Sequence, residues 1–157
     1  MASSAIVLGL AVGPEGNSAP LAREPRERLE LVAGQGVKGD KKLGKNPDRA
    51  VNLLSEQSYT WFQRSFGREL AMPGGLGEQV VISNAIDPAW LPLGARLQVG
   101  EALLEVFSPR KPCDHLAGTL KCGKDSYFVG HVGVMCRVLQ GGVVRRGDTV
   151  TLLQGNC

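Results

Sequence analysis

The chain has 157 residues, enough for one domain with a proper core and too few for two comfortable ones. A net charge of +3 and an aromatic content of 5% do not indicate a nucleic-acid-binding protein. No apolar run reaches membrane-spanning length, and the apolar residues 1–12 lack the basic start of a secretion signal. The four cysteines match no disulfide scaffold, so we expect free thiols in a cytoplasmic protein. From the charge, the aromatic content and the length of the apolar runs, we expect no membrane or nucleic-acid partner.

The chain is rich in turn-forming residues, with 21 glycines and 9 prolines between short strand-like segments. Apolar and alternating runs predict strands at 5–11, 28–32, 50–54, 78–82, 95–99, 103–107, 132–139 and 149–153. These strands follow one another too closely for crossover helices, which argues against a doubly wound parallel sheet. We expect a mostly β fold, a closed or nearly closed antiparallel β-barrel with one or two helices. It forms a single domain over residues 5–153, followed by a tail over 154–157.

One convincing helix is predicted at residues 55–66. Ser55 is suited to the N-cap position, and Gly67 is a natural terminator. Tyr59, Phe62 and Phe66 share one face at helical spacing, so they form an apolar stripe that packs on the core.

The loop at residues 34–48 combines glycines with the densest positive charge of the chain. Its cations and the arginine that follows are Lys38, Lys41, Lys42, Lys45 and Arg49. Such a loop is either a solvated surface or a site for a phosphate or another anion. Residues 34–39 also match the G-x-G-x-x-G dinucleotide pattern. The residues that follow do not favour the helix start that binds a pyrophosphate, which argues against a Rossmann site.

Cys113 stands at the end of the run Ser-Pro-Arg-Lys-Pro-Cys, just after a predicted strand. The two prolines stiffen this segment and favour an extended backbone. Arg110 and Lys111 supply positive charge, which lowers the pKa of a nearby thiol and favours the nucleophilic thiolate. The residues alone leave two readings open, a reactive thiol or a buried small side chain in a turn.

The remaining cysteines and histidines form no recognised site. The spacing of Cys113, His115, Cys122 and His131 fits no usual zinc pattern. A Cys-His protease dyad with Cys113 has no helix start or oxyanion hole beside it. We expect Cys136 in the core or on a sheet face, Cys122 in a loop and Cys157 in a mobile tail.

An ordered series of short motifs spans most of the chain. The series is Gly36-Val37-Lys38-Gly39-Asp40, Arg49-Ala50-Val51-Asn52-Leu53-Leu54, Gly77-Glu78, Leu93-Gly94-Ala95-Arg96-Leu97, Ser108-Pro109-Arg110-Lys111-Pro112-Cys113, Arg137-Val138-Leu139, Gly141-Gly142-Val143-Val144 and Gly147-Asp148. This series resembles the MOSC domain, named for the C-terminal domain of molybdenum cofactor sulfurases. The resemblance covers roughly residues 5–153.

The resemblance implies a strand-rich barrel, similar to the pyruvate kinase barrel, that handles sulfur or the molybdenum cofactor. It implies that Cys113 carries sulfane sulfur as a persulfide, or ligates molybdenum in members that reduce N-hydroxylated compounds. Residues expected to line the same cleft or hold the cofactor are Lys38, Gly39, Asp40, Lys41, Arg49, Glu78, Arg110 and Lys111. The expected partners are a cysteine desulfurase, which carries its own pyridoxal phosphate, and a molybdenum or metal–sulfur enzyme as acceptor.

The chain departs from the family pattern at two points. Lys41 and Lys42 replace a histidine that often follows the Gly-Asp, and Gln79 replaces the asparagine expected after the Gly-Glu. Three functions therefore stay open at this stage. They are a sulfur carrier or molybdenum-cofactor-binding module, a molybdenum-dependent reductase of N-hydroxylated compounds, and a non-catalytic binding module with a structural Cys113.

Overall fold

The computed structural model describes residues 4–16, 23–110 and 130–153. The strands of the main sheet are β1 (Ser4–Val12), β2 (Glu24–Arg26), β5 (Val51–Ser55), β6 (Val80–Ile82), β7 (Arg96–Val99), β8 (Ala102–Pro109), β9 (Val134–Gln140) and β11 (Thr149–Leu153). A smaller sheet contains β3 (Arg28–Val32), β4 (Gly36–Val37) and β10 (Gly142–Arg145). The helix is α1 (Glu56–Phe66), and two 3-10 turns are η1 (Pro47–Arg49) and η2 (Pro88–Trp90).

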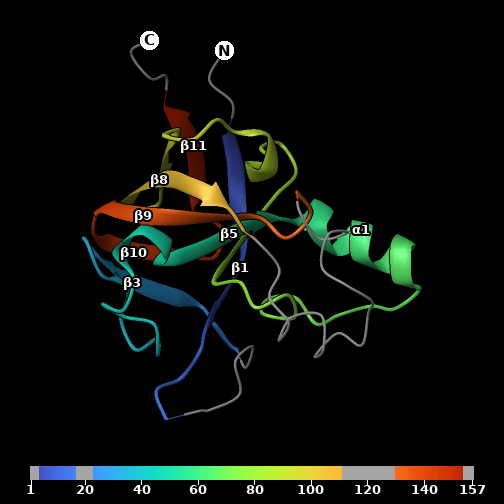
Figure 1. The fold of residues 1–157 in the computed structure, drawn as a ribbon, viewed down its shortest axis with the longest axis horizontal. Helices are drawn as coiled ribbons and strands as arrows, with labels where there is room; N and C mark the ends of the chain where they lie inside the picture. The colour runs from blue at the N-terminus through green and yellow to red at the C-terminus, as the bar shows by residue number, and fades with distance from the viewer. Residues whose placement is uncertain (1–3, 17–22, 111–129, 154–157) are drawn as a thin grey trace.

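The main sheet closes into a seven-stranded barrel. Its order is β11-β7-β8-β9-β5-β6-β1, and β1 pairs with β11 to complete the ring, while β2 adds to the side of β1. Figure 1 shows the barrel with α1 projecting from the side of β5 and the small sheet of β3 and β10 beneath it. Every pairing in the ring is antiparallel except that of β5 with β6, which the chain connects through α1. The predicted fold class is therefore confirmed.

Alternating side chains divide the apolar residues into two cores. Val51, Leu53, Val80 and Cys136 point into the barrel, and the whole interior cluster is closed to solvent. Leu54 and Val81 point outward and pack beneath α1, against Phe62 and the partly buried Tyr59 and Phe66. The predicted apolar stripe of the helix and the predicted core position of Cys136 are thus confirmed.

Some element boundaries differ from those predicted. The strand expected at residues 78–82 begins at Val80, because the carboxylate of Glu78 binds the backbone of the preceding turn instead of facing a neighbouring strand. No strand was predicted between residues 139 and 149, yet Gly142 begins β10. This strand exists because it pairs with β3, a partner distant in sequence. Gly67 ends α1 with a φ of 67°, as predicted.

None of the described helices is long and apolar enough to cross a membrane.

Candidate functional site

The candidate site lies on the outer surface of the barrel, where β5 and β6 run parallel. The register places Leu53 beside Val80, so Asn52 and Gln79 are also neighbours and both point away from the interior. They are buried by segments that cover this surface, since Asn52 and Gln79 are each only 1% exposed. The turn of Gly39 and Asp40 and the start of the segment after β8 approach the same surface.

Asp40 is the centre of the hydrogen-bond network at this surface. Its carboxylate accepts bonds from the backbone N–H of Gly13 and of Lys42, each at 2.9 Å, and from the Gln79 amide at 3.4 Å. Gly39 supplies the tight turn, with a φ of 84° that side-chain-bearing residues rarely adopt. The network fixes the cationic loop to the end of β1, so the turn cannot swing freely.

Gln79 joins that network to the barrel. Its side-chain oxygen accepts a 2.7 Å bond from the backbone N–H of Asn52, while its amide donates to Asp40. The asparagine of the family pattern is shorter by one methylene than this glutamine. The longer side chain here spans from β5 to the Gly-Asp turn.

Glu78 is fully buried and organises the turn before β6. It accepts bonds from the Tyr59 hydroxyl at 2.5 Å and from the backbone N–H groups of Gly74 at 2.9 Å and Leu76 at 3.2 Å. Burial and the adjacent Glu78 carboxylate raise the pKa of Tyr59 well above its ordinary value. The carbonyl of Leu76 then accepts a bond from the Arg110 guanidinium. Glu78 therefore positions Arg110.

The Arg110 backbone is held as well as its side chain. Its N–H donates to the carbonyl of Gly133 at 3.0 Å, and the residue is 7% exposed. Gly133 has a φ of 83°, and a Cβ there would collide with the backbone of Leu53. The close approach of these segments therefore requires glycine.

Cations from three separate parts of the chain lie within electrostatic range of Lys42, beside Asp40. These cations are Arg23, Arg49 and Arg110. Burial first, then Arg23 and Arg110, lower the pKa of Lys42 to about 8, and Arg49 adds to this while Asp40 opposes it. Burial and Arg23 also lower the pKa of Lys41. The cations therefore outnumber the nearby carboxylates. The oxygens of those carboxylates already accept hydrogen bonds from backbone and side-chain groups.

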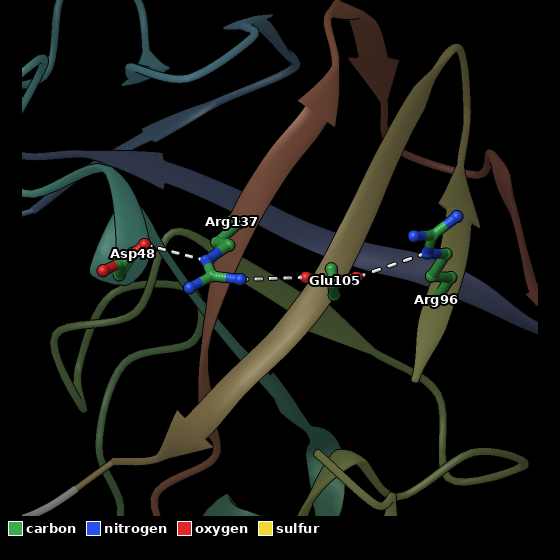
Figure 2. A network of polar contacts seen from close by, with 4 residues as sticks. All are labelled: Asp48, Arg96, Glu105 and Arg137. Carbon is green, nitrogen blue, oxygen red and sulfur yellow. Dashed lines mark hydrogen bonds and ion pairs between the residues drawn. The ribbon is translucent and has the colours of Figure 1, made fainter. Parts of the chain in front are cut away.

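A network of ion pairs on the outer side of β8 and β9 holds η1 through Asp48. Figure 2 shows Arg137 between Asp48 and Glu105, with Nε–Oδ1 and Nη1–Oε1 distances of 2.7 and 3.2 Å. Glu105 also pairs with Arg96 at 3.3 Å. Arg137 lies over the Phe107 ring at 4.6 Å. Because Asp48 precedes Arg49, this network fixes the turn that presents Arg49.

The structure brings together five of the eight residues predicted to line the cleft or hold a cofactor. Gly39, Asp40, Arg49 and Arg110 belong to the cluster, with Glu78 behind Arg110. Lys41 lies at its margin, with its N–H bonded to the Gly13 carbonyl at 2.8 Å. Lys38 lies apart, because its side chain is 65% exposed and pairs with Glu30. Lys111 and Cys113 fall outside the described residues.

Sequence reasoning missed one cation of the cluster, Arg23, and did not distinguish another, Lys42, from its neighbours. Arg23 belongs to no motif of the series, and the sequence carries no signal that would have singled it out. Lys42 stood in the cationic loop, where only its proximity to Arg23 and Arg110 distinguishes it from the neighbouring lysines.

The residues of this cluster are suited to an anionic, phosphate-bearing cofactor. Guanidinium and ammonium groups are the donors that bind phosphate oxygens. Asn52 adds a buried amide whose Nδ2 and Oδ1 have no hydrogen-bond partner among the residues that the structure describes. Buried polar atoms of this kind are normally satisfied, so the amide is available to a bound molecule or water.

Comparisons with solved structures show the same fold. The YuaD protein of Bacillus subtilis superposes with a TM-score of 0.80 at 20% identity, covering 98% of this chain and 99% of that one. YiiM of Escherichia coli gives a TM-score of 0.71 at 22% identity, covering 96% of this chain and 71% of that one. YiiM of Geobacillus stearothermophilus gives 0.69 at 21% identity over 96% and 73%.

Sequence comparisons identify longer relatives. E. coli YiiM is 28% identical over 106 residues, which cover 64% of this chain and 47% of that protein. A protein named Reductase from Gibberella moniliformis is 29% identical over 153 residues, covering 92% of this chain and 27% of its own length. The chain therefore spans less than half of either relative. The family model of the MOSC domain matches residues 40–151, which include every described member of the cluster except Arg23 and Gly39, and the chain belongs to the MOSC domain family.

Proposed function

We propose that this protein is a molybdenum-cofactor-related sulfur carrier in which Cys113 accepts sulfane sulfur as a persulfide. A cysteine desulfurase supplies the sulfur, and a metal–sulfur centre or the molybdenum cofactor receives it. The observation that carries the proposal is the cation cluster at the end of β8, because β8 leads directly to the Pro-Arg-Lys-Pro-Cys run.

The chain connection limits how far Cys113 can be from this cluster. Cys113 follows Arg110 by three residues, and three trans peptide units span at most about 11 Å between Cα atoms. Arg110 is anchored through both its backbone and its guanidinium. A thiol tethered this close to fixed positive charge is favoured in its thiolate form.

Sulfur transfer to Cys113 needs no redox partner. The Cys113 thiolate attacks the outer sulfur of the donor persulfide, and the sulfur–sulfur bond of the donor breaks. The donor leaves as its own thiolate, and the transferred sulfur keeps its oxidation state in the new Cys113 persulfide. Arg110 and Lys111 stabilise the negative sulfur before and after the step.

The molybdenum cofactor would be held through its phosphate by Lys42, Arg49 and Arg110, with the Asn52 amide available to its polar groups. When bound, the cofactor supplies a redox-active metal with sulfur ligands. The contribution of this chain is to bind the anion, to exclude water with the surrounding buried side chains and to orient the cofactor beside the Pro-Arg-Lys-Pro-Cys segment.

A second candidate function is reduction of N-hydroxylated compounds, with Cys113 as a molybdenum ligand. The observation that favours it is the 29% identity to the Gibberella protein named Reductase, together with a cation cluster suited to a resident cofactor. Elemental analysis of the purified protein separates the two functions. Stoichiometric molybdenum supports the reductase, and its absence from active sulfur-loaded protein supports the carrier.

The sulfur-carrier function is tested by incubating the protein with a cysteine desulfurase and cysteine, then measuring its intact mass. We expect the gain of one sulfur atom, reversed by a thiol reductant and abolished by Cys113→Ala. Cys136→Ala is the matched control, because burial inside the barrel raises the pKa of the Cys136 thiol to about 12 and makes it unreactive. Equal sulfur loading of Cys113→Ala and the unaltered protein would contradict the proposal. A slow alkylation rate at Cys113 with an ordinary pH dependence would instead support a structural cysteine in a non-catalytic module.

A further inference from the structure

The side chain of Asn52 is buried without a hydrogen-bond partner in the part of the chain that the structure describes. It is 1% exposed, and both its Oδ1 and its Nδ2 are unbonded there. The backbone of the same residue is fully paired, because its N–H donates to the Gln79 side chain at 2.7 Å and its carbonyl accepts from the Gln79 N–H at 3.1 Å. A buried amide without partners costs stability. Its presence therefore indicates a partner that comes from outside the chain.

Gln79 joins Asn52 to the cationic loop. Alternation along β5 and β6 puts the side chains of Asn52 and Gln79 on the same outer face of the barrel. The Gln79 amide donates to the Asp40 carboxylate at 3.4 Å, and that carboxylate also accepts from the backbone N–H of Lys42 at 2.9 Å. A single intervening side chain thus separates Asn52 from the turn that begins the loop.

The register of β8, β9 and β5 places Arg110 on the other side of the amide. Ser108 pairs with Met135, and Met135 pairs with Asn52, so these three residues form one row across the sheet. Arg110 follows Ser108 by two residues, and its N–H donates to the carbonyl of Gly133, two residues before Met135. Arg110 therefore lies one row further along the same face. Strand spacing and rise put the Cα atoms of Arg110 and Asn52 about 12 Å apart.

From these contacts we infer that Asn52 determines the specificity of the anion site, by recognising ligands that join a phosphate through a spacer to a planar group with adjacent hydrogen-bond donor and acceptor. Arg110 and the cationic loop hold the phosphate. The Asn52 Oδ1 accepts from the donor of the planar group, and its Nδ2 donates to the acceptor. The inference deepens the proposed function and rests on its anion site, but it requires neither Cys113 nor a sulfur donor.

The chemistry of the amide selects this class of ligand. An asparagine side chain presents one donor and one acceptor side by side, the arrangement that pairs with the edge of a nucleobase. Inorganic phosphate or a sugar phosphate would pair with the cations but leave the amide without a planar partner. The separation of Arg110 from Asn52 requires a spacer such as a ribose between the phosphate and the planar group.

The test compares uridine 5′-monophosphate with ribose 5-phosphate, which lacks the planar group, by isothermal titration. We expect the unaltered protein to bind the nucleotide at least about tenfold more tightly, the effect of two hydrogen bonds to an otherwise unbonded amide. Asn52→Leu should reduce this ratio to less than about threefold and change the affinity for ribose 5-phosphate by less than about twofold. Uridine, which lacks the phosphate, should bind at least about tenfold more weakly than the nucleotide.

Thermal unfolding of the unliganded protein gives a second measurement. Asn52→Leu removes an unbonded buried amide, so it should raise Tm by about 2–6 °C. Asn84→Leu is the matched control, because Asn84 is exposed and its Oδ1 accepts from the Gln57 N–H at 2.8 Å. This control should not raise Tm and should keep the binding ratio. Asn52→Ala, which adds no bulk, tests the same ratio if Asn52→Leu does not fold.

Three results would overturn the inference, and they are distinguishable from failure of the proposed function. The first is equal binding of the nucleotide and ribose 5-phosphate by the unaltered protein. The second is a preference for the nucleotide that survives both substitutions of Asn52. The third is a Tm that falls in Asn52→Leu while the ratio persists, which would assign the amide to the structure alone. Loss of all phosphate binding would remove the anion site itself, and sulfur loading of Cys113 is measured separately.

Discussion

Two buried carboxylates shape the site at the scale of single residues. Asp40 and Glu78 each accept several hydrogen bonds, and most of these come from backbone N–H groups of nearby turns. Their negative charge is therefore used to fix the chain rather than to neutralise the neighbouring cations. The result is a rigid set of turns that presents Lys42, Arg49 and Arg110 with excess positive charge.

The Glu78 carboxylate should contribute more to the free energy of unfolding than the Tyr59 hydroxyl that donates to it. We expect Glu78→Gln to lower the free energy of unfolding by about 2–3 kcal/mol, because its amide places a donor against the N–H groups of Gly74 and Leu76. Tyr59→Phe should cost about 1 kcal/mol, since Glu78 keeps its backbone donors. Urea unfolding followed by circular dichroism measures both. Equal costs for the two variants would show that the turn does not depend on the carboxylate.

Lys42 should destabilise the folded protein at neutral pH. Its pKa is about 8 in the folded state and near the ordinary 10.5 in the unfolded state. The unfolded state therefore binds more protons between these values, so the contribution of Lys42 to stability rises with pH across this window. Lys42→Met should raise the free energy of unfolding by about 1–3 kcal/mol at pH 7, and the gain should fade by pH 10.5.

Unfolding curves at pH 7 and pH 10.5 test this pH dependence. Lys38→Met is the control, because Lys38 is exposed and its removal should change stability by no more than about 0.5 kcal/mol. A Lys42→Met variant that is no more stable than the unaltered protein at pH 7 would contradict the charge imbalance.

At this scale the sequence predicted the residues that belong to motifs. Asp40, Arg49, Glu78 and Arg110 were identified through the family resemblance, and they lie in or directly behind the cluster. Arg23 and the distinct character of Lys42 could not be predicted, because both depend on contacts between segments far apart in the chain. The position of Cys113 stays a prediction.

At the scale of elements, the turn η1 depends on strands that are distant in sequence. Arg137 on β9 pairs with Asp48 on η1, and Glu105 on β8 fixes Arg137 from the other side (Figure 2). Arg137 does not belong to the cation cluster. We therefore regard it as a positioning residue for Arg49.

Loss of the Arg137–Asp48 pair should weaken anion binding without removing any anion ligand. We expect Arg137→Met and Asp48→Asn each to lower the affinity for inorganic phosphate about threefold, and the double variant to lower it no further. Isothermal titration measures the affinities. Arg146→Met is the matched control, because Arg146 forms a similar 3.0 Å pair with Glu27 elsewhere on the surface. If the free-energy losses of the two single variants added up in the double variant, Arg137 and Asp48 would act independently, which would contradict the positioning role of their ion pair.

Element predictions succeeded where the pattern is local. The strand at residues 28–32, the helix and its glycine terminator follow from alternation, helical spacing and capping. The β10 strand did not follow, because Gly141 and Gly142 favour a turn, and Gly142 is extended through its pairing with β3. Ser55 occupies the N-cap position, but its hydroxyl makes no cap bond to the helix.

At the scale of the whole molecule, closure of the barrel through β1 and β11 creates an interior without solvent. Leu104 is fully buried there, whereas Trp90 on η2 is 86% exposed. We expect Leu104→Ala to lower the free energy of unfolding by about 2–5 kcal/mol through lost burial and a residual cavity. Trp90→Ala should change it by no more than about 0.5 kcal/mol. Urea unfolding compares the two variants, and similar costs would contradict this assignment of the core.

The barrel as a class was predictable, since many short strands between glycine turns favour closure. The strand order was not. Insertion of β9 between β8 and β5, and the parallel pairing of β5 with β6, depend on long-range contacts that no local pattern encodes. The candidate site lies over that parallel pair.

The parallel pair has a consequence for how the protein acquires its site during folding. A hairpin cannot join β5 and β6, because parallel strands need a long connection, here α1 and the turns that follow it. Loop closure over this connection must precede the contact of Asn52 with Gln79. Antiparallel hairpins such as β7–β8 need only a short loop and can form earlier. We therefore expect the cation cluster to be assembled late in folding, after much of the barrel has formed.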